Sequence, residues 1–100
     1  MIKHIVLWTL HEQAEDRTKA ENAAQAKRQL EALNGRIEGL LSLEVGIDLL
    51  HTDSSADLSL VATFASLEAL EAYQQHPEHK ALMPFMAAIR YDRRVIDYAL

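Results

Sequence analysis

The sequence predicts an α+β fold in which one antiparallel sheet carries its helices on a single face. Alternating apolar residues predict strands near both ends of the chain and in its middle, and residues with a helical period of three and four lie between them. The resulting order is strand, helix, strand, strand, helix, strand. This βαββαβ order is that of the ferredoxin-like fold, so we expect both helices on one face of the sheet.

The composition predicts one small domain that spans residues 1–100. Hydrophobic residues make up 49% of the 100 residues. In a chain of this length, the burial of a single core only just outweighs the loss of chain entropy on folding. The 10 basic and 15 acidic residues give a net charge of −5, which leaves no basic surface for nucleic acid or for an anionic membrane. The absence of cysteine excludes disulfides and thiolate sites, and it fits a cytoplasmic protein.

The first predicted strand, Ile2–Leu10, is apolar on both of its faces. His4 and Trp8 share one face, whereas Ile5 and Leu7 point the other way. A strand that is apolar on both faces is usually buried on both, but one layer of helices covers only one of them. We therefore expect a second subunit to cover the other face, which makes the protein a homodimer. The apolar run is too short for a signal peptide or a membrane span.

The other strands are predicted from alternation as well. Leu40–Leu50 and Leu58–Ala65 alternate between apolar and more polar residues, and Arg90–Ala99 closes the chain as a strand with a charged, exposed part. The segment between the first two of these strands is polar and rich in turn-forming residues. We expect it to be a loop in which His51 is solvated.

Two helices are predicted from spacing and from end signals. Small and apolar residues at helical spacing predict a helix over Asp16–Leu33, which the pair Asn34–Gly35 ends. Ser66 is a good N-cap for a second helix that begins at Leu67 and includes Tyr73. Pro77 should break that helix at His76 and open a new turn.

A second proline affects the segment that follows. Pro84 lacks an amide hydrogen and interrupts a helical path again. The apolar residues from Leu82 to Ile89 are therefore expected to form short packed turns that belong to the core.

The stretch from Tyr73 to His79 is the strongest candidate for chemistry, because it holds two of the five histidines. Imidazole titrates near neutral pH, so His79 can act as a general base, and the Tyr73 hydroxyl can donate a proton to an enolate oxygen. A structural interpretation also stays open. In it Tyr73 packs under the sheet, His76 caps a helix end and His79 donates to a backbone carbonyl.

We expect a largely apolar cavity between the helices and the sheet, with His4, Trp8 and His76 as ligand-binding residues beside His79 and Tyr73. An apolar or aromatic small molecule would fit such a cavity. His4 and Trp8 are alternatively plain core residues. His76 and His79 are separated by a proline, and no further ligand completes a metal-binding set, so we expect no metal site and no cofactor.

Four stretches carry a resemblance to a known family. They are Met1-Ile2-Lys3-His4-Ile5-Val6-Leu7-Trp8, Phe64 with Ser66-Leu67-Glu68-Ala69-Leu70, Tyr73-Gln74-Gln75-His76-Pro77-Glu78-His79, and Asp97-Tyr98. In this order they span nearly the whole chain, which resembles the stress-responsive A/B barrel (Dabb) family. The resemblance implies a homodimeric, ferredoxin-like α+β barrel.

The resemblance implies more than one activity. One branch of the family resembles polyketide cyclases, in which a histidine and a tyrosine around a pocket do the proton work. These roles would fall on His79 and Tyr73, with His4 lining the same cavity. The cyclase pattern has a further histidine near the start of the third strand, where this chain has Asp57-Leu58-Ser59. Monooxygenases of the same architecture are the rival enzyme class, and a dimeric binding or stress-related module is the non-enzymatic interpretation.

Overall fold

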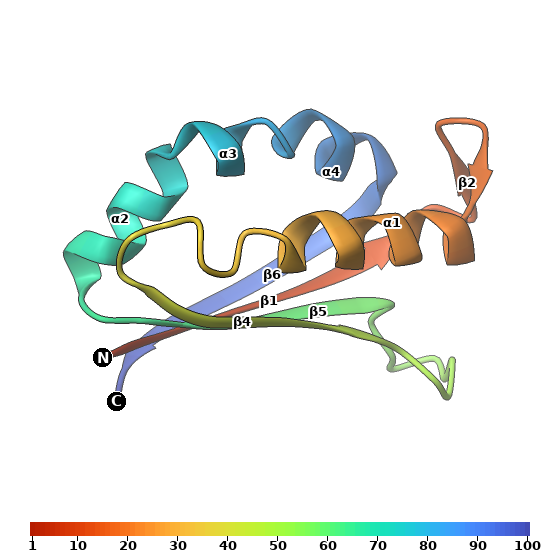
Figure 1. Ribbon diagram of the computed structural model, residues 1–100. Coiled ribbons are helices and arrows are strands. Elements are labelled where there is room, and N and C mark those ends of the chain that lie inside the picture. Colours follow the sequence, from red (N-terminus) through yellow and green to blue (C-terminus); the bar gives the residue numbers. More distant parts are fainter.

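The computed structural model describes all of residues 1–100 and consists of a four-stranded antiparallel sheet with its helices on one side (Figure 1). The strands, in spatial order, are β4 (Leu40–Ile47), β5 (Leu58–Phe64), β1 (Ile2–Leu10) and β6 (Arg90–Ala99). The helices are α1 (Lys19–Glu31), α2 (Leu67–Gln75), α3 (Pro77–Lys80) and α4 (Met83–Ile89). The predicted α+β class and its ferredoxin-like strand order are confirmed.

The core lies between this sheet and the helices. Burial alternates along β5 in the pattern that the sequence predicted, and on β1 it selects the face that carries His4, Val6, Trp8 and Leu10. The helices contribute mostly small and apolar residues to the same core. Its buried hydrophobic members are Val6, Trp8, Leu10, Ala23, Ala26, Leu30, Leu33, Ile37, Leu40, Leu43, Val45, Leu58, Leu60, Ala62, Phe64, Leu70, Tyr73, Met86 and Ile89.

A small hairpin precedes α1 and corrects the predicted start of that helix. The hairpin pairs β2 (Gln13–Ala14) with β3 (Arg17–Thr18), and its turn residues Glu15 and Asp16 both have positive φ, at 53° and 58°. The helix therefore begins at Lys19 and not at Asp16, the start that helical spacing predicted. Thr18 caps it, because its side chain accepts from the Glu21 amide while the Glu21 carboxylate accepts from the Thr18 amide.

Both prolines lie in the first turn of a helix, Pro77 in α3 and Pro84 in α4. Ser66 caps α2 as predicted, and the helix ends at His76, directly before Pro77 opens α3. The short packed turns expected from Leu82 to Ile89 are a single helix, α4, which carries Pro84 in its first turn and so is not interrupted by it. In the first turn the missing amide hydrogen would have no partner within the helix, so proline is tolerated there.

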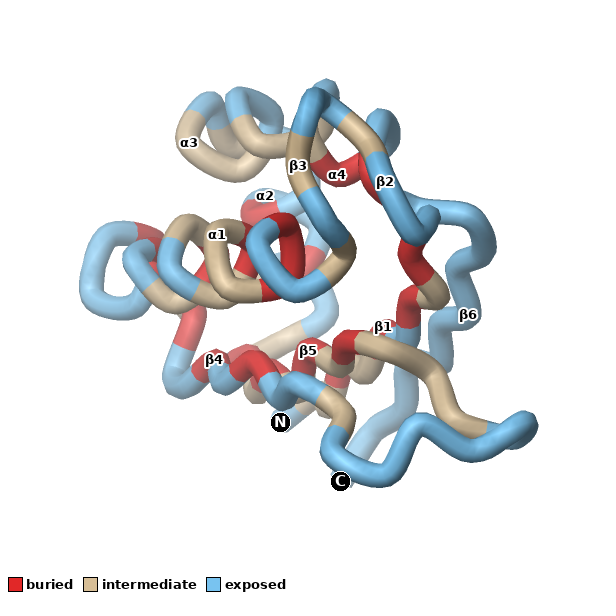
Figure 2. The backbone as a smooth tube through the Cα atoms, turned by 90° about the vertical axis from the view of Figure 1, so that its right-hand side faces the viewer, coloured by how far each residue is buried: buried red, intermediate tan, exposed pale blue.

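The sheet face that points away from the helices is open. It carries Leu7 of β1 and, from β6, Ile96 and Tyr98, which are 42%, 59% and 42% exposed. Strand β6 is exposed along its whole length, as Figure 2 shows by its pale blue colour. A bulge between Leu40 and Ser42 also interrupts the alternation of β4 and leaves Leu41 exposed.

Candidate functional site

A cavity of about 160 Å³ lies between the sheet and the helices α2, α3 and α4. Its floor comes from the helix-facing side of β1 and β5, and its wall comes from the helices and from the start of β6. The lining residues are His4, Val6, Trp8, Leu30, Leu60, Tyr73, Gln74, His79, Met83, Met86, Ala87, Arg90 and Arg93. Most of them are apolar, which is typical of a small-molecule site with a few polar groups that fix orientation.

His79, on α3, is one of the residues that line this cavity. Its Nδ1 atom is buried and has no hydrogen-bond partner in the protein. Burial lowers the pKa of His79, a hydrogen bond with the Gln74 backbone acts in the opposite direction, and electrostatic interactions with His4, Arg93 and His76 lower the pKa further. The imidazole is therefore neutral at pH 7 and has a free nitrogen lone pair.

Tyr73 lies beside His79, on α2. The two ring centroids are 4.3 Å apart, and the Tyr73 residue is only 1% exposed. Burial raises the pKa of the Tyr73 hydroxyl to about 12, although the Arg93 charge acts in the opposite direction. The phenol thus keeps its proton at any ordinary pH.

His4 occupies the floor of the cavity, at 4% exposure. Its Nδ1 atom pairs with the carboxylate of Asp97, which lies directly opposite on β6. Its ring lies 6.4 Å from that of Tyr73 and 6.3 Å from that of Phe64, with edge-to-face geometry in both cases. The structure thus brings His4, Tyr73 and His79 into one aromatic cluster.

Trp8 and His76, the other two sequence candidates, differ in position. Trp8 is buried and lines the cavity. His76 does not line it, because its Nδ1 atom accepts from the amide of Glu78 and its backbone joins α2 to α3. His76 therefore acts as a helix cap, as the structural interpretation of the sequence expected.

Two cavity residues were missed by sequence reasoning. Arg90 and Arg93 line the cavity at the start of β6, where the sequence indicated only a charged, exposed part of the last strand. The available signal was alternation: Arg93 has the same parity as Val95 and Asp97, and it pairs with Trp8 across the sheet. That register puts Arg93 on the helix-facing side.

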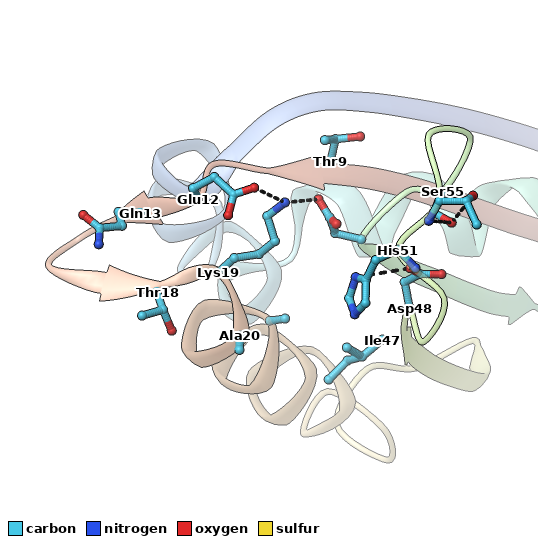
Figure 3. Close-up of a pocket in the computed structure, with 13 residues that line it drawn as sticks. Thr9, Glu12, Gln13, Thr18, Lys19, Ala20, Ile47, Asp48, His51 and Ser55 are labelled. Atoms are coloured by element: carbon cyan, nitrogen blue, oxygen red, sulfur yellow. Dashed lines mark hydrogen bonds and ion pairs between the residues drawn. The ribbon is translucent and has the colours of Figure 1, made fainter.

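A larger hollow, of about 1070 Å³, opens between the N-terminal end of α1 and the loop that joins β4 to β5 (Figure 3). Several of its polar groups pair with one another. The Lys19 ammonium lies 3.1 Å from Glu12 and 3.3 Å from Asp57, and these two partners outweigh burial and raise the pKa of Lys19. His51 projects into it with an exposed side chain and lies 3.5 Å from Asp48.

Neither hollow gathers a metal-binding set. The structure brings together no group of three or more His, Cys, Asp or Glu side chains that could hold a metal ion. No helix combines the length and the apolar character that a membrane crossing requires.

The smaller cavity combines a neutral base, His79, with a protonated phenol, Tyr73. This pair suits proton transfer to and from a bound compound.

Comparison with solved structures gives the same fold. A dimeric ferredoxin-like protein of unknown function from Thermobifida fusca is 28% identical, with 99% of this chain and 90% of that chain covered and a TM-score of 0.84. A dimeric protein of unknown function from Bacteroides fragilis is also 28% identical, with 99% and 95% covered and a TM-score of 0.81. An antibiotic biosynthesis monooxygenase is 16% identical, with 100% and 98% covered and a TM-score of 0.74, so it shares the fold alone.

Sequence comparison identifies the family. No curated protein matches the chain. The sequence model of the Stress responsive A/B Barrel Domain matches residues 2–100, almost the full length. The strand order, the helix-covered cavity and this match agree, and the chain belongs to the stress responsive A/B barrel (Dabb) family.

Proposed function

We propose that this protein binds a small carbonyl compound in the cavity and transfers a proton at the carbon next to the carbonyl. The observation that carries the proposal is the buried, unpartnered Nδ1 atom of His79 beside the Tyr73 ring. A buried polar atom without a partner costs about 1–3 kcal/mol. A ligand that donates a hydrogen bond to this atom would offset this cost. A histidine with a purely structural role would gain nothing from leaving the atom without a partner.

The reaction follows from the protonation states of the pair. The neutral Nδ1 atom of His79 takes a proton from the α-carbon, and the electrons of the C–H bond form the C=C bond of an enolate, with the negative charge on oxygen. The Tyr73 hydroxyl donates a hydrogen bond to that oxygen and stabilises it. The enolate carbon then takes the proton back from the His79 imidazolium, or it attacks a second carbonyl carbon, whose C=O π electrons move onto oxygen to give an alkoxide that takes the His79 proton.

The division of roles is the one that the cyclase-like resemblance implies for His79 and Tyr73. The further histidine of that pattern has no counterpart here: Asp57, at the corresponding place, forms an ion pair with Lys19 in the other hollow and accepts a hydrogen bond from the Leu10 amide. Proton transfer at carbon is therefore the part of the cyclase chemistry that the present residues support. His4 and Trp8 contribute to ligand binding as cavity lining.

The protein acts as a homodimer in this proposal. Self-association is supported by the dimeric relatives from Thermobifida fusca and Bacteroides fragilis. The open sheet face supports it as well, because Leu7, Ile96 and Tyr98 give it apolar area that a second copy can cover. The absence of cysteine supports a cytoplasmic location.

The test is proton exchange at carbon, followed by NMR in D2O. The probes are 4-phenylbutan-2-one and 2-oxo-4-phenylbutanoate, which both carry a methylene group next to the carbonyl. We expect the protein to accelerate the loss of the methylene signal and His79→Asn to reduce that acceleration by on the order of 100-fold, the usual scale for a general base. Tyr73→Phe should also reduce it.

His51→Asn is the matched control. It makes the same change at an exposed histidine, and asparagine tolerates the positive φ of 52° at that position. The control should exchange the probes at the wild-type rate. Saturable binding of both probes without any accelerated exchange by the wild-type protein would mean that the cavity binds ligands but does no chemistry.

A further inference from the structure

The size of the cavity limits what it can enclose. Its volume of about 160 Å³ is close to that of engineered protein cavities of roughly 150 Å³ that bind benzene. The deep part is apolar, with Val6, Leu30, Leu60 and Met86 in its lining. One ring or a short chain therefore fills it, and any larger substrate must extend out through the opening.

The side of the cavity toward β6 is cationic. Arg90 ends α4 and begins β6, and Arg93 follows on the helix-facing side of that strand. Both residues are exposed and both line the cavity, so their side chains border the space where it meets solvent. A group that extends from a bound ring toward solvent at β6 would meet them.

Neither arginine is paired with a carboxylate. The ion pair on β6 joins Arg94 to Asp92, and the one near α3 joins Arg36 to Glu78. Asp97, the carboxylate nearest to the cavity floor, is paired with His4. In a chain with a net charge of −5, two guanidinium groups at one cavity without acidic partners are an exception to the overall charge.

The charge of Arg93 reaches the reacting groups. Burial is the larger cause of the pKa shift at both Tyr73 and His79, but the Arg93 charge opposes the rise at Tyr73 and adds to the lowering at His79, so its field favours negative charge at that end of the cavity. An enolate oxygen formed near Tyr73 would be stabilised by the same field. Arginine also has a planar, forked arrangement of donors that matches a carboxylate with two parallel hydrogen bonds.

We propose that Arg90 and Arg93 bind a carboxylate of the substrate, so that the substrate class is a small oxo acid whose apolar part fills the cavity. This inference rests on the proposed function only in that the carbonyl group lies near His79 and Tyr73. The carboxylate lies at the β6 side, the apolar group occupies the deep part, and the arginines are specificity-determining residues. Two arginines in an acidic chain are too few for a nucleic-acid surface.

The test compares two probes that differ in one group. In 2-oxo-4-phenylbutanoate a carboxylate takes the position of the terminal methyl group of 4-phenylbutan-2-one. Binding is followed by the fluorescence of Trp8, the one tryptophan of the chain, which lines the cavity. We expect the wild-type protein to bind the oxo acid at least tenfold more tightly than the ketone, and added NaCl to weaken only the oxo acid.

The variants are Arg90→Gln, Arg93→Gln and the double substitution. Each single change should weaken oxo-acid binding by about tenfold, the scale of one charged hydrogen bond, and the double change should remove the preference over the ketone. Arg28→Gln, an exposed residue of α1, changes the net charge equally and should leave the preference intact. Circular dichroism confirms that each variant is folded.

Failure of this inference differs from failure of the proposed function. Equal binding of the two probes by the wild-type protein, no detectable oxo-acid binding at millimolar concentration, or a preference that survives the double substitution would each overturn the carboxylate site. In contrast, His79→Asn should reduce exchange by on the order of 100-fold and keep the preference for the oxo acid. A preference without any exchange would support the carboxylate site and contradict the proton transfer.

Discussion

His79 and Tyr73 lie with their ring centroids 4.3 Å apart and their planes inclined by 46°, and both line the same cavity. Burial acts on the two residues in opposite directions on the pKa scale. It lowers the pKa of His79 and raises the pKa of Tyr73 to about 12, so each side chain is neutral at pH 7. One cavity thus holds a free base and a proton donor at the same time.

The burial of His79 should make the stability of the protein depend on pH. Its pKa is 6.5 in the unfolded chain and lower in the fold, so acid protonates the unfolded state first. The contribution of the neutral His79 to the free energy of unfolding is complete above pH 6.5, and it is lost as the pH falls through the lower, folded-state pKa. Urea unfolding between pH 7.5 and pH 5 should show a smaller loss for His79→Asn than for the wild-type protein or for His51→Asn. Equal losses in all three would contradict the burial of a neutral His79.

The open sheet face should carry the dimer contact. Leu7→Arg introduces a charge at its centre, and in a symmetric dimer the same charge comes from the second copy, so we expect a monomer. Sedimentation at micromolar concentration measures the change against a dimeric wild type. Leu67→Arg is the control, because Leu67 is 53% exposed on α2, on the other side of the sheet. A dimer that tolerates Leu7→Arg would assign the contact to another surface.

Two glycines with positive φ should respond differently to alanine. At Gly35 a Cβ meets nothing within 4 Å, so Gly35→Ala should cost only the backbone strain, about 1–2 kcal/mol. At Gly39 a Cβ would lie 2.6 Å from the Ala69 Cβ of α2, so Gly39→Ala adds roughly 1–3 kcal/mol of overpacking. Urea unfolding should therefore rank Gly39→Ala as the less stable variant. The reverse order would mean that α2 shifts freely away from Gly39.

The capping box of α1 should contribute measurably to stability. Thr18→Ala removes the side-chain acceptor for the Glu21 amide and should cost about 1 kcal/mol in the free energy of unfolding. Thr52→Ala changes an exposed loop threonine and should stay within about 0.5 kcal/mol of the wild type. Urea titrations of the two variants at one pH measure both values. A loss at Thr52 as large as that at Thr18 would rule out a special role for the cap.

The strands could be predicted from the sequence because their faces differ in polarity. β1 and β6 begin and end where alternation predicted, and Ser66 and Pro77 bound α2 as expected from their backbone chemistry. The hairpin around Glu15 and Asp16 gave no such signal, since its two-residue strands bury little and its turn lacks glycine. The local sequence carries no clear pattern where tertiary contacts determine the backbone conformation, as they do in this hairpin.

The candidate site was predicted in part for the same reason. Tyr73 and His79 are close in sequence, so one helix break was enough to bring them together, and His4 follows from the alternation of β1. His76 was assigned to the cavity by proximity alone, and the direction of its side chain depends on the cap that it makes. Arg90 and Arg93 required the register of β6 against β1, which a single sequence does not specify.

The pH dependence of proton exchange tests the central claim, that His79 is the base, most directly. The exchange rate at saturating 2-oxo-4-phenylbutanoate should rise with pH through an apparent pKa below 6.5 and then stay level, because Tyr73 keeps its proton up to about pH 12. His79→Asn should remove this rise together with most of the rate, and His51→Asn should change neither. A rise of unchanged midpoint and height in His79→Asn would contradict the account and assign the base to another group.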